Sequence, residues 1–218
     1  MKIQYFGHSY LLISGGDYSI ALDPYGDIGL IPPIVSADYV FSSHSHYDHN
    51  NFSVVKGAKL IDKSQGAFKV IPSFHDNEKG SLRGLNNILL FTLDGYTLAF
   101  MGDYGEYDNK EIIKALYGVD ILFIPVGGKY TIDSKTAKYY VDSILPKTVV
   151  PIHYNIKGST VDIKGVEEFL KLVNNSKIVS SPFEYNNESR VVVVRSEVKE
   201  DLWVIVGNIL KNQQALKN

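Results

Sequence analysis

Short segments in which apolar residues alternate with polar ones, or run together, fill the first half of the chain. Both patterns are typical of β-strands, half-buried in the first case and buried on two faces in the second. They predict strands over residues 3–6, 9–14, 18–22, 39–43, 59–61, 68–73, 87–93 and 97–100. Gly15-Gly16-Asp17 and Asp94-Gly95 separate neighbouring segments and indicate tight turns. We expect these strands to follow one another as a meander.

The second half changes to helical spacing. Apolar residues recur three and four positions apart over residues 109–117, 134–144 and 161–173, which predicts three helices. Apolar runs over residues 120–125, 148–152 and 191–194 predict buried strands between and after them. Strands followed by alternating helices and strands indicate an α/β layered fold with mixed sheets.

The last part of the chain predicts an amphipathic helix over residues 202–210. Its apolar positions follow the i, i+3, i+4, i+7, i+8 pattern at Leu202, Ile205, Val206, Ile209 and Leu210. We favour a terminal helix that packs on its own domain. A contact between two copies of the chain, giving a homo-oligomer, is the alternative.

Composition narrows the classes of function. The 218 residues suit one domain with a full core, and the net charge of −2 provides no broad basic surface for nucleic acid. The chain has no cysteine, so a metal would be held by histidine or carboxylate side chains. The first residues alternate like a strand, not a signal peptide, and no apolar run could span a bilayer. We therefore expect a soluble cytoplasmic protein without a membrane partner.

The histidines are grouped in a way that predicts a metal site. Three of the six stand in one hexamer, just after a predicted buried strand: His44-Ser45-His46-Tyr47-Asp48-His49. His75, Asp103 and His153 each come just past another predicted strand. Residues beyond strand ends converge on one edge of the sheet in α/β folds, so these side chains are expected to share a site. Imidazoles and carboxylates are ligands that borderline divalent cations prefer.

At this point the chain resembles a known family. His44-x-His46-x-Asp48-His49, followed by His75, Asp103 and His153, is similar to the signature of the metallo-β-lactamase superfamily. The branch related to ascorbate-6-phosphate lactonase is closer still. Its motifs correspond to Gly7-His8-Ser9, Asp23-Pro24, Phe74-His75-Asp76, Arg83-Gly84-x-Asn86, Gly102-Asp103-Tyr104-Gly105, residues 125–131 and residues 151–154. Related sequences often carry histidine where this chain has Met101, a departure expected to alter either substrate fit or the groups that surround the ligands.

The resemblance implies a four-layer αβ/βα sandwich with two mixed sheets over residues 1–195, followed by a C-terminal helical extension over 196–218. It also implies two divalent cations, zinc first and manganese or iron next. By carry-over, His44, His46 and His75 hold the first cation, Asp48, His49 and His153 hold the second, and Asp103 bridges them. Such a pair activates a shared water for hydrolysis and polarises the scissile bond. Asp48 and Asp103 are therefore the predicted catalytic carboxylates.

Five further residues are candidates for support of the ligands or for substrate contact. Asp23 ends a predicted strand and is a candidate to orient a ligand imidazole. The alternative, that it is an ordinary carboxylate in a turn, is equally favoured. His8 is expected beside the ligands or the substrate rather than among the ligands. Asp76 is expected to touch substrate or to cap a loop. Arg83 and Asn86 are candidates to grip an anionic group, although an arginine in a loop is usually only solvated.

The expected function is hydrolysis of an ester, lactone, amide or phosphodiester in a small-molecule substrate. A metal-dependent ribonuclease or phosphodiesterase that acts on RNA is the enzymatic alternative, against which the near-neutral charge weighs mildly. A non-catalytic metal-binding regulatory protein is the third interpretation. The chain keeps all seven ligand positions, which argues against that interpretation.

Overall fold

The N-terminal strands form a six-stranded mixed sheet. The computed structural model describes residues 1–187 and 190–197. The sheet has the order β14-β1-β2-β3-β5-β7. Its strands are β1 (Lys2–Tyr5), β2 (Leu11–Ser14), β3 (Ser19–Leu22), β5 (Tyr39–Phe41), β7 (Lys59–Leu60) and β14 (Phe183–Glu184). The expected meander is confirmed from β1 to β3 but is interrupted there, because β5 and β7 pair in parallel. It resumes over residues 68–100, whose three strands pair antiparallel in the second sheet. A parallel pair needs a crossover, and residues 23–38 provide it.

The second sheet has seven strands in the order β13-β15-β12-β11-β10-β9-β8. They are β8 (Phe68–Phe74), β9 (Leu85–Leu93), β10 (Tyr96–Phe100), β11 (Ile121–Pro125), β12 (Thr148–Ile152), β13 (Ser176–Val179) and β15 (Val191–Val194). The Asp94-Gly95 hairpin between β9 and β10 is confirmed, with both residues at positive φ. Every residue of β11, β12 and β15 is buried, as expected for strands covered on both faces.

Five short elements were not predicted from the sequence. These are β4 (Val35–Ser36) and β6 (Val55–Lys56), which form a separate pair, a 3₁₀ turn at Phe52–Val54, and the strands β13 and β14. All have at most four residues, but the predicted strands β7 and β15 are as short, so length alone does not explain the omission.

The helices are α1 (Lys110–Leu116), α2 (Ser134–Ile144) and α3 (Glu167–Leu172). Asn109 and Asp133 cap the first two through their side chains, which explains where these helices begin. The predicted third helix was wrong in its first half. Residues before Glu167 are instead tied to the loop after β11, since Lys164 N–H donates to the carbonyl of Gly127.

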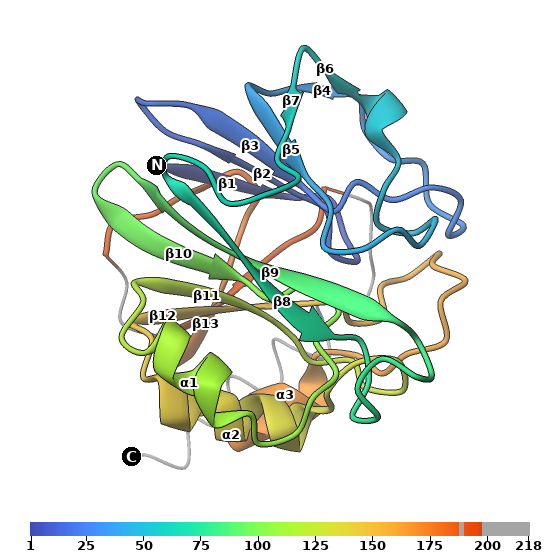
Figure 1. Ribbon diagram of the computed structural model, residues 1–218, viewed down its shortest axis with the longest axis vertical. Coiled ribbons are helices and arrows are strands. Elements are labelled where there is room, and N and C mark those ends of the chain that lie inside the picture. Colours follow the sequence, from blue (N-terminus) through green and yellow to red (C-terminus); the bar gives the residue numbers. More distant parts are fainter. Residues whose placement is uncertain (188–189, 198–218) are drawn as a thin grey trace.

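The two sheets pack face to face, and α1, α2 and α3 lie along the outer face of the seven-stranded sheet (Figure 1). The predicted sandwich of two mixed sheets is thus confirmed. Within residues 1–187 and 190–197, the outer face of the six-stranded sheet carries no α-helix. The T-shaped contact of Phe41 with Phe100 joins β5 to β10 across the core, and both rings are buried. Burial of such aromatic side chains is a main source of stability.

Two predictions concern the end of the chain. The helix expected over 202–210, with its alternative as a dimer contact, lies outside the described residues. The division at residue 195 also stays a prediction. None of the helices in the described ranges has the length and apolar character that a bilayer span requires.

Candidate metal centre

All of the expected ligand residues come from loops that follow strands. His44, His46, Asp48 and His49 follow β5, His75 follows β8, Asp103 follows β10 and His153 follows β12. The loop after β1 brings His8 to the same place. Of the strands that precede these loops, β1 and β5 belong to the six-stranded sheet and β8, β10 and β12 to the seven-stranded sheet. The site therefore combines loops of both sheets at one edge of the sandwich.

The first group of imidazoles is the one expected for the first cation. His44, His46 and His75 each offer a ring nitrogen, and these nitrogens lie within 4.8 Å of one another. The rings of His44 and His46 have centroids 4.5 Å apart, and those of His44 and His75 4.7 Å apart. His44 and His75 are buried, whereas His46 is exposed on the cavity side.

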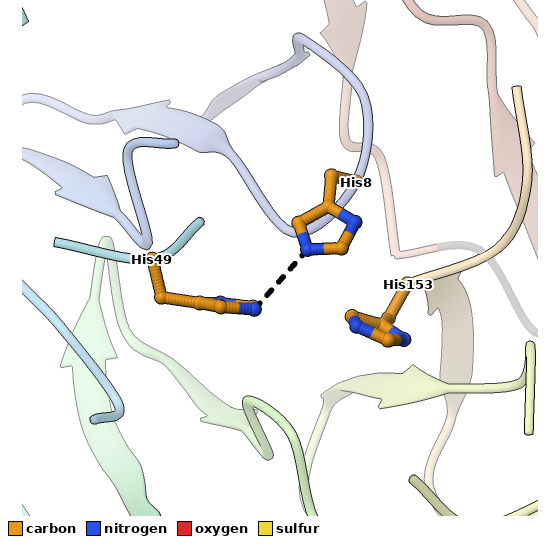
Figure 2. A group of neighbouring side chains, drawn as sticks. All are labelled: His8, His49 and His153. Atoms are coloured by element: carbon orange, nitrogen blue, oxygen red, sulfur yellow. Dashed lines mark hydrogen bonds between the residues drawn. The ribbon is translucent and has the colours of Figure 1, made fainter. Parts of the chain in front are cut away.

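The second group differs from the expected one. His8, His49 and His153 have ring nitrogens within 4.8 Å of one another, and all three rings are buried (Figure 2). Asp48, which was expected here, lies beside the group: its Oδ2 is 3.2 Å from His8 Nε2 and 3.5 Å from His49 Nε2. His8 therefore belongs to this group, and Asp48 lies next to it.

Asp103 lies between the two groups. Its Oδ2 is 3.2 Å from His75 Nε2, 3.2 Å from His49 Nε2 and 3.1 Å from His153 Nε2. One carboxylate oxygen thus contacts imidazoles of both groups, which is the position that a bridging ligand requires.

Hydrogen bonds orient three of the imidazoles so that Nε2 points inward. His49 Nδ1 donates to Asp23 Oδ2 at 2.7 Å, and His75 Nδ1 donates to the Tyr130 carbonyl at 3.1 Å. His44 Nδ1 donates to Ser43 Oγ at 2.9 Å, which donates in turn to Asp23 Oδ2 at 2.6 Å. A proton held on Nδ1 leaves the lone pair on Nε2, which is what a metal ligand needs.

Sequence reasoning named Asp23 for this orienting role but missed Ser43 and the Tyr130 carbonyl. The position of Ser43 directly before His44 was an available signal. The carbonyl of Tyr130 is a backbone atom 55 residues from its partner, so side-chain patterns carry no trace of it.

The backbone is strained at three residues of the site. His8, Asp23 and His153 have φ values of +53°, +44° and +49°, in the left-handed region that non-glycine residues seldom adopt. The carbonyl of His8 accepts hydrogen bonds from the Tyr5 hydroxyl at 2.8 Å and from His153 N–H at 2.7 Å. The loops after β1 and β12 are therefore locked to each other behind the imidazoles.

Asn86 holds the turn that carries Asp103. Its Nδ2 donates to Ser73 Oγ and to the Met101 carbonyl, and its Oδ1 accepts from Asp103 N–H at 3.0 Å. Asn86 is fully buried, so it does not reach a substrate, contrary to the expectation that it grips an anionic group. Met101 is also fully buried and fills the core just before the turn that carries Asp103.

Asp76 caps a loop, which was one of its two expected roles. Its carboxylate accepts four backbone N–H groups between residues 78 and 83, including that of Arg83 at 2.7 Å. These bonds fix the backbone of Arg83, whose guanidinium lies over the Tyr130 ring at 5.8 Å. Among the described residues, no carboxylate forms an ion pair with Arg83. Its charge is thus available at the cavity wall.

A cavity of about 660 Å³ opens in front of the site. His46, Asp48, His75, Asp103 and His153 line its floor. Its walls come from Ser45, Tyr47, Arg83, Tyr130, Thr160, Val161 and Asp162. This volume suits a small organic molecule.

Burial keeps two imidazoles neutral. It lowers the pKa of His44 to about 2. Burial, helped by the charge of His153, lowers the pKa of His8 to about 4. Near pH 7 both rings therefore carry a free lone pair.

The carboxylates are held ionised. Burial alone would raise the pKa of Asp103, but the adjacent His153 and His49 hold it well below its usual value. Burial is likewise outweighed at Asp48, where hydrogen bonds with His49 and His8 lower the pKa. His49 shows the reverse: burial opposes its charge, yet Asp103 and Asp23 raise its pKa well above 6.5.

The donor set fits divalent cations. His44 Nε2, Asp103 Oδ1 and both ring nitrogens of His153 are buried and have no hydrogen-bond partner. Unsatisfied buried polar atoms are costly, and a bound cation is one way to satisfy them. The set contains nitrogen and oxygen donors without sulfur, which suits zinc, manganese or iron.

Known proteins share this architecture and sequence. The model of the β-lactamase superfamily domain matches residues 2–153. A metal-dependent hydrolase from Staphylothermus marinus is 32% identical over 215 residues, which cover 80% of this chain and 91% of the relative. A metal-dependent hydrolase from Bacillus licheniformis is 27% identical over 195 residues, with coverage of 71% and 86%. A crystal structure of a candidate zinc-dependent hydrolase of the metallo-β-lactamase superfamily, from Thermotoga maritima, superposes with a TM-score of 0.73 at 31% identity. The superposition covers 88% of this chain and 97% of the chain in the crystal structure.

Proposed function

The chain belongs to the β-lactamase superfamily and is a metal-dependent hydrolase, and from this premise we propose that its reaction uses two divalent cations held by the two imidazole groups. The ligands proposed for the first cation are His44, His46 and His75, and those for the second are Asp48, His49 and His153, with Asp103 shared. The proposed reaction is attack of water on an ester, lactone, amide or phosphodiester.

The position of Asp103 carries this proposal. A carboxylate that served only one cation would contact imidazoles of one group. Asp103 Oδ2 instead lies within 3.2 Å of His75 in one group and of His49 and His153 in the other. Its other oxygen, Oδ1, is buried without a hydrogen-bond partner and is available as a donor.

Two bound cations would lower the pKa of a water between them toward ~7 and polarise the bond to be cleaved. Asp48 is suited to orient that water. Its carboxylate is ionised, lines the cavity and is held by His8 Nε2 at 3.2 Å. Because His44 and His8 are neutral near pH 7, the positive charge of the cations is offset mainly by Asp48 and Asp103. No serine or cysteine nucleophile is required.

The cavity supports a small substrate with an anionic group. Its volume of about 660 Å³ can enclose most of such a molecule, and Arg83 supplies an unpaired positive charge at the wall. Lactones are the first class to test, because of the resemblance of Gly7-His8-Ser9 and later motifs to the lactonase branch. RNA is the weaker alternative, since the net charge of the chain is −2.

Metal analysis and one substitution test the proposal. Protein purified without chelator should contain about two divalent cations per chain. Asp103→Asn keeps the shape of the side chain but removes its charge, and should lose both the second cation and the activity. Asp142→Asn, on the exposed face of α2, is the matched control and should change neither. One cation per chain in the wild type, or full activity of Asp103→Asn, would contradict the proposal.

A substrate panel tests the bond that is broken. Lactones, phosphodiesters and short RNAs should be offered to the wild type and to Asp48→Asn. The authentic substrate class is the one that the wild type turns over and that Asp48→Asn turns over more slowly when both proteins are assayed with cations in excess. Turnover that is equal in both proteins indicates a contaminating activity or a wrong role for Asp48.

A further inference from the structure

His8 lies close to the side chains proposed to hold the second cation. Its Nε2 lies 3.1 Å from His49 Nε2 and 3.2 Å from Asp48 Oδ2. Its ring also lies against that of His153, with centroids 4.4 Å apart. Figure 2 shows the three imidazoles pointing toward a common centre from three separate loops. The side chain of His8 is almost fully buried, so these contacts are its main polar surroundings.

The distances among the donor atoms match those around one cation. Ligand atoms bound tetrahedrally at 2.0–2.1 Å from zinc lie about 3.3 Å from one another. His8 Nε2, His49 Nε2 and Asp48 Oδ2 form a triangle with sides of 3.1, 3.2 and 3.5 Å. A cation bound by His49 and Asp48 would therefore lie at bonding distance from His8 as well.

The backbone around His8 directs its ring toward this centre. His8 follows Gly7 in a turn where both residues have positive φ, at +53° and +96°. The His8 carbonyl is held by Tyr5 and by the backbone of His153, itself a proposed ligand. A strained residue kept in place by buried hydrogen bonds is typical of a functional position. A histidine that only filled space would not need this conformation.

We propose that His8 Nε2 is a ligand of the second cation, beside His49 and His153. The inference rests on the proposed two-cation function and deepens it. The second cation would then have three imidazole donors, as the first has in His44, His46 and His75, and all six histidines of the chain would bind metal. A site with three imidazoles prefers zinc to manganese, because manganese favours oxygen donors.

The test compares zinc affinity in the full-length wild type and in His8→Asn. Asparagine tolerates positive φ, so this substitution removes the imidazole and keeps the turn. Metal-free protein is titrated with zinc in competition with a chromophoric chelator. We expect the second zinc to bind more than 100-fold more weakly in His8→Asn and the first to change less than threefold. Loss of a residue that only orients a ligand typically costs 10–100-fold.

Asp108→Asn is the matched control, because Asp108 is also a non-glycine residue at positive φ but lies outside the metal centre. Its zinc affinities should equal those of the wild type. If the wild type binds two zinc ions and His8→Asn weakens the second less than 100-fold, the ligand role of His8 is wrong and the two-cation function stands. If the wild type binds only one, the proposed function itself fails.

A crystal structure of the zinc-loaded wild type keeps the inference testable if His8→Asn does not fold. The anomalous signal of the second zinc should lie within about 2.3 Å of His8 Nε2, near the usual zinc–nitrogen bond length. A zinc ion at a longer distance, with His8 bonded to Asp48 alone, would overturn the ligand role.

Discussion

His49 Nδ1 donates a hydrogen bond to Asp23 Oδ2 at 2.7 Å, and both side chains are completely buried. The pair joins the loop after β5 to the end of β3. Asp23 also accepts the backbone N–H and the hydroxyl of Ser43, each at 2.6 Å. One carboxylate therefore orients His49 directly and His44 through Ser43, one imidazole from each group. Asp23 is the structural link between the two proposed cations on the side opposite Asp103.

Asp23→Asn should weaken both cations. The amide keeps the size of the side chain and tolerates the positive φ of this position, but one of its two acceptor oxygens is lost. We expect metal affinity to fall about 10–100-fold, the usual effect of removing a partner that orients a ligand. Isothermal titration with zinc measures it. Ser43→Ala is the control, since it should affect mainly the cation bound by His44. Equal affinities in Asp23→Asn and wild type would show that Asp23 is only a turn residue.

Metal-free protein should lose stability on acidification below pH 6.5. Burial lowers the pKa of His8 to about 4 and that of His44 to about 2, so between pH 6.5 and 4 the unfolded chain binds protons that the folded chain does not. Each imidazole then contributes a loss of about 1.4 kcal/mol per pH unit. The raised pKa of buried Asp23 offsets part of the loss, because its folded form takes up a proton in acid. Each imidazole can contribute at most about 1.7 kcal/mol between pH 6.5 and 5, so we expect a net decrease of about 1–3 kcal/mol.

Urea unfolding at several pH values checks this expectation. The free energy of unfolding of His8→Asn should depend less steeply on pH, because this variant lacks one of the two imidazoles that stay neutral in the folded chain. A free energy of unfolding that stays constant from pH 6.5 to 5 would contradict the neutral state assigned to these rings.

The sequence predicted which side chains gather at the site better than it predicted the contacts that position them. The proposed ligands lie in short motifs after strands, and such motifs name side chains whose chemistry is already informative. The hydrogen bonds of His75 with the Tyr130 carbonyl and of His153 N–H with the His8 carbonyl are backbone contacts between distant loops. No residue pattern encodes them, so they became visible only in the folded chain.

The fold was likewise predicted from the sequence only in part. The helical spacing of residues 134–144 and the apolar run of residues 148–152 predicted α2 and β12 with their observed ends, because both patterns are local. The parallel pairing of β5 with β3 depends on the path of residues 23–38, which have no periodicity. Asn86 was a candidate to grip an anionic group, but it is buried and its side chain holds the turn of Asp103.

Arg83→Gln should impair anionic substrates selectively. The guanidinium lies at the cavity wall without a carboxylate partner among the described residues, so its removal deletes a charge-assisted contact. Such contacts contribute about 1.5–3 kcal/mol, which corresponds to a fall in kcat/KM of about 10–100-fold. Neutral substrates and metal content should change little. Lys138→Gln is the control, since Lys138 is paired with Asp142 on α2 and does not line the cavity. An equal effect on charged and neutral substrates would remove Arg83 from substrate binding.

Gly102→Ala should displace Asp103. A Cβ at Gly102 would lie 2.3 Å from Ser43 Cβ and 2.7 Å from Asn86 Oδ1, in a backbone with φ of +55°. Gly95→Ala, at φ of +78° with nothing within 4 Å, shares the backbone penalty but not the clash. Thermal unfolding of the two variants separates these effects. We expect Gly95→Ala to cost about 1 kcal/mol and Gly102→Ala clearly more, with loss of a cation. Equal stability and full metal content in both would show that the turn can shift freely.

Metal binding should release a proton from His49, the hydrogen-bond partner of Asp23. Asp103 and Asp23 raise the pKa of His49 well above 6.5, so without a cation the ring is charged near pH 7. A cation needs the lone pair on Nε2, and its affinity should therefore rise about tenfold per pH unit below that raised pKa. Zinc titrations from pH 6 to 8, with proton release followed in two buffers of different ionisation enthalpy, measure the slope.

Asp23→Asn provides the decisive comparison for this slope. Without the Asp23 carboxylate, the pKa of His49 should fall, so that less of the ring is charged at pH 7 and fewer protons leave on binding. The variant should then show a flatter pH dependence between pH 7 and 8, together with weaker binding at pH 8, where the orienting bond matters most. If orientation were the only role of Asp23, affinity would fall equally at every pH. If charge were its only role, the two proteins would bind zinc equally at high pH. A flatter slope together with weaker binding at pH 8 would show that Asp23 both aligns the imidazole of His49 and holds its proton until a cation replaces it.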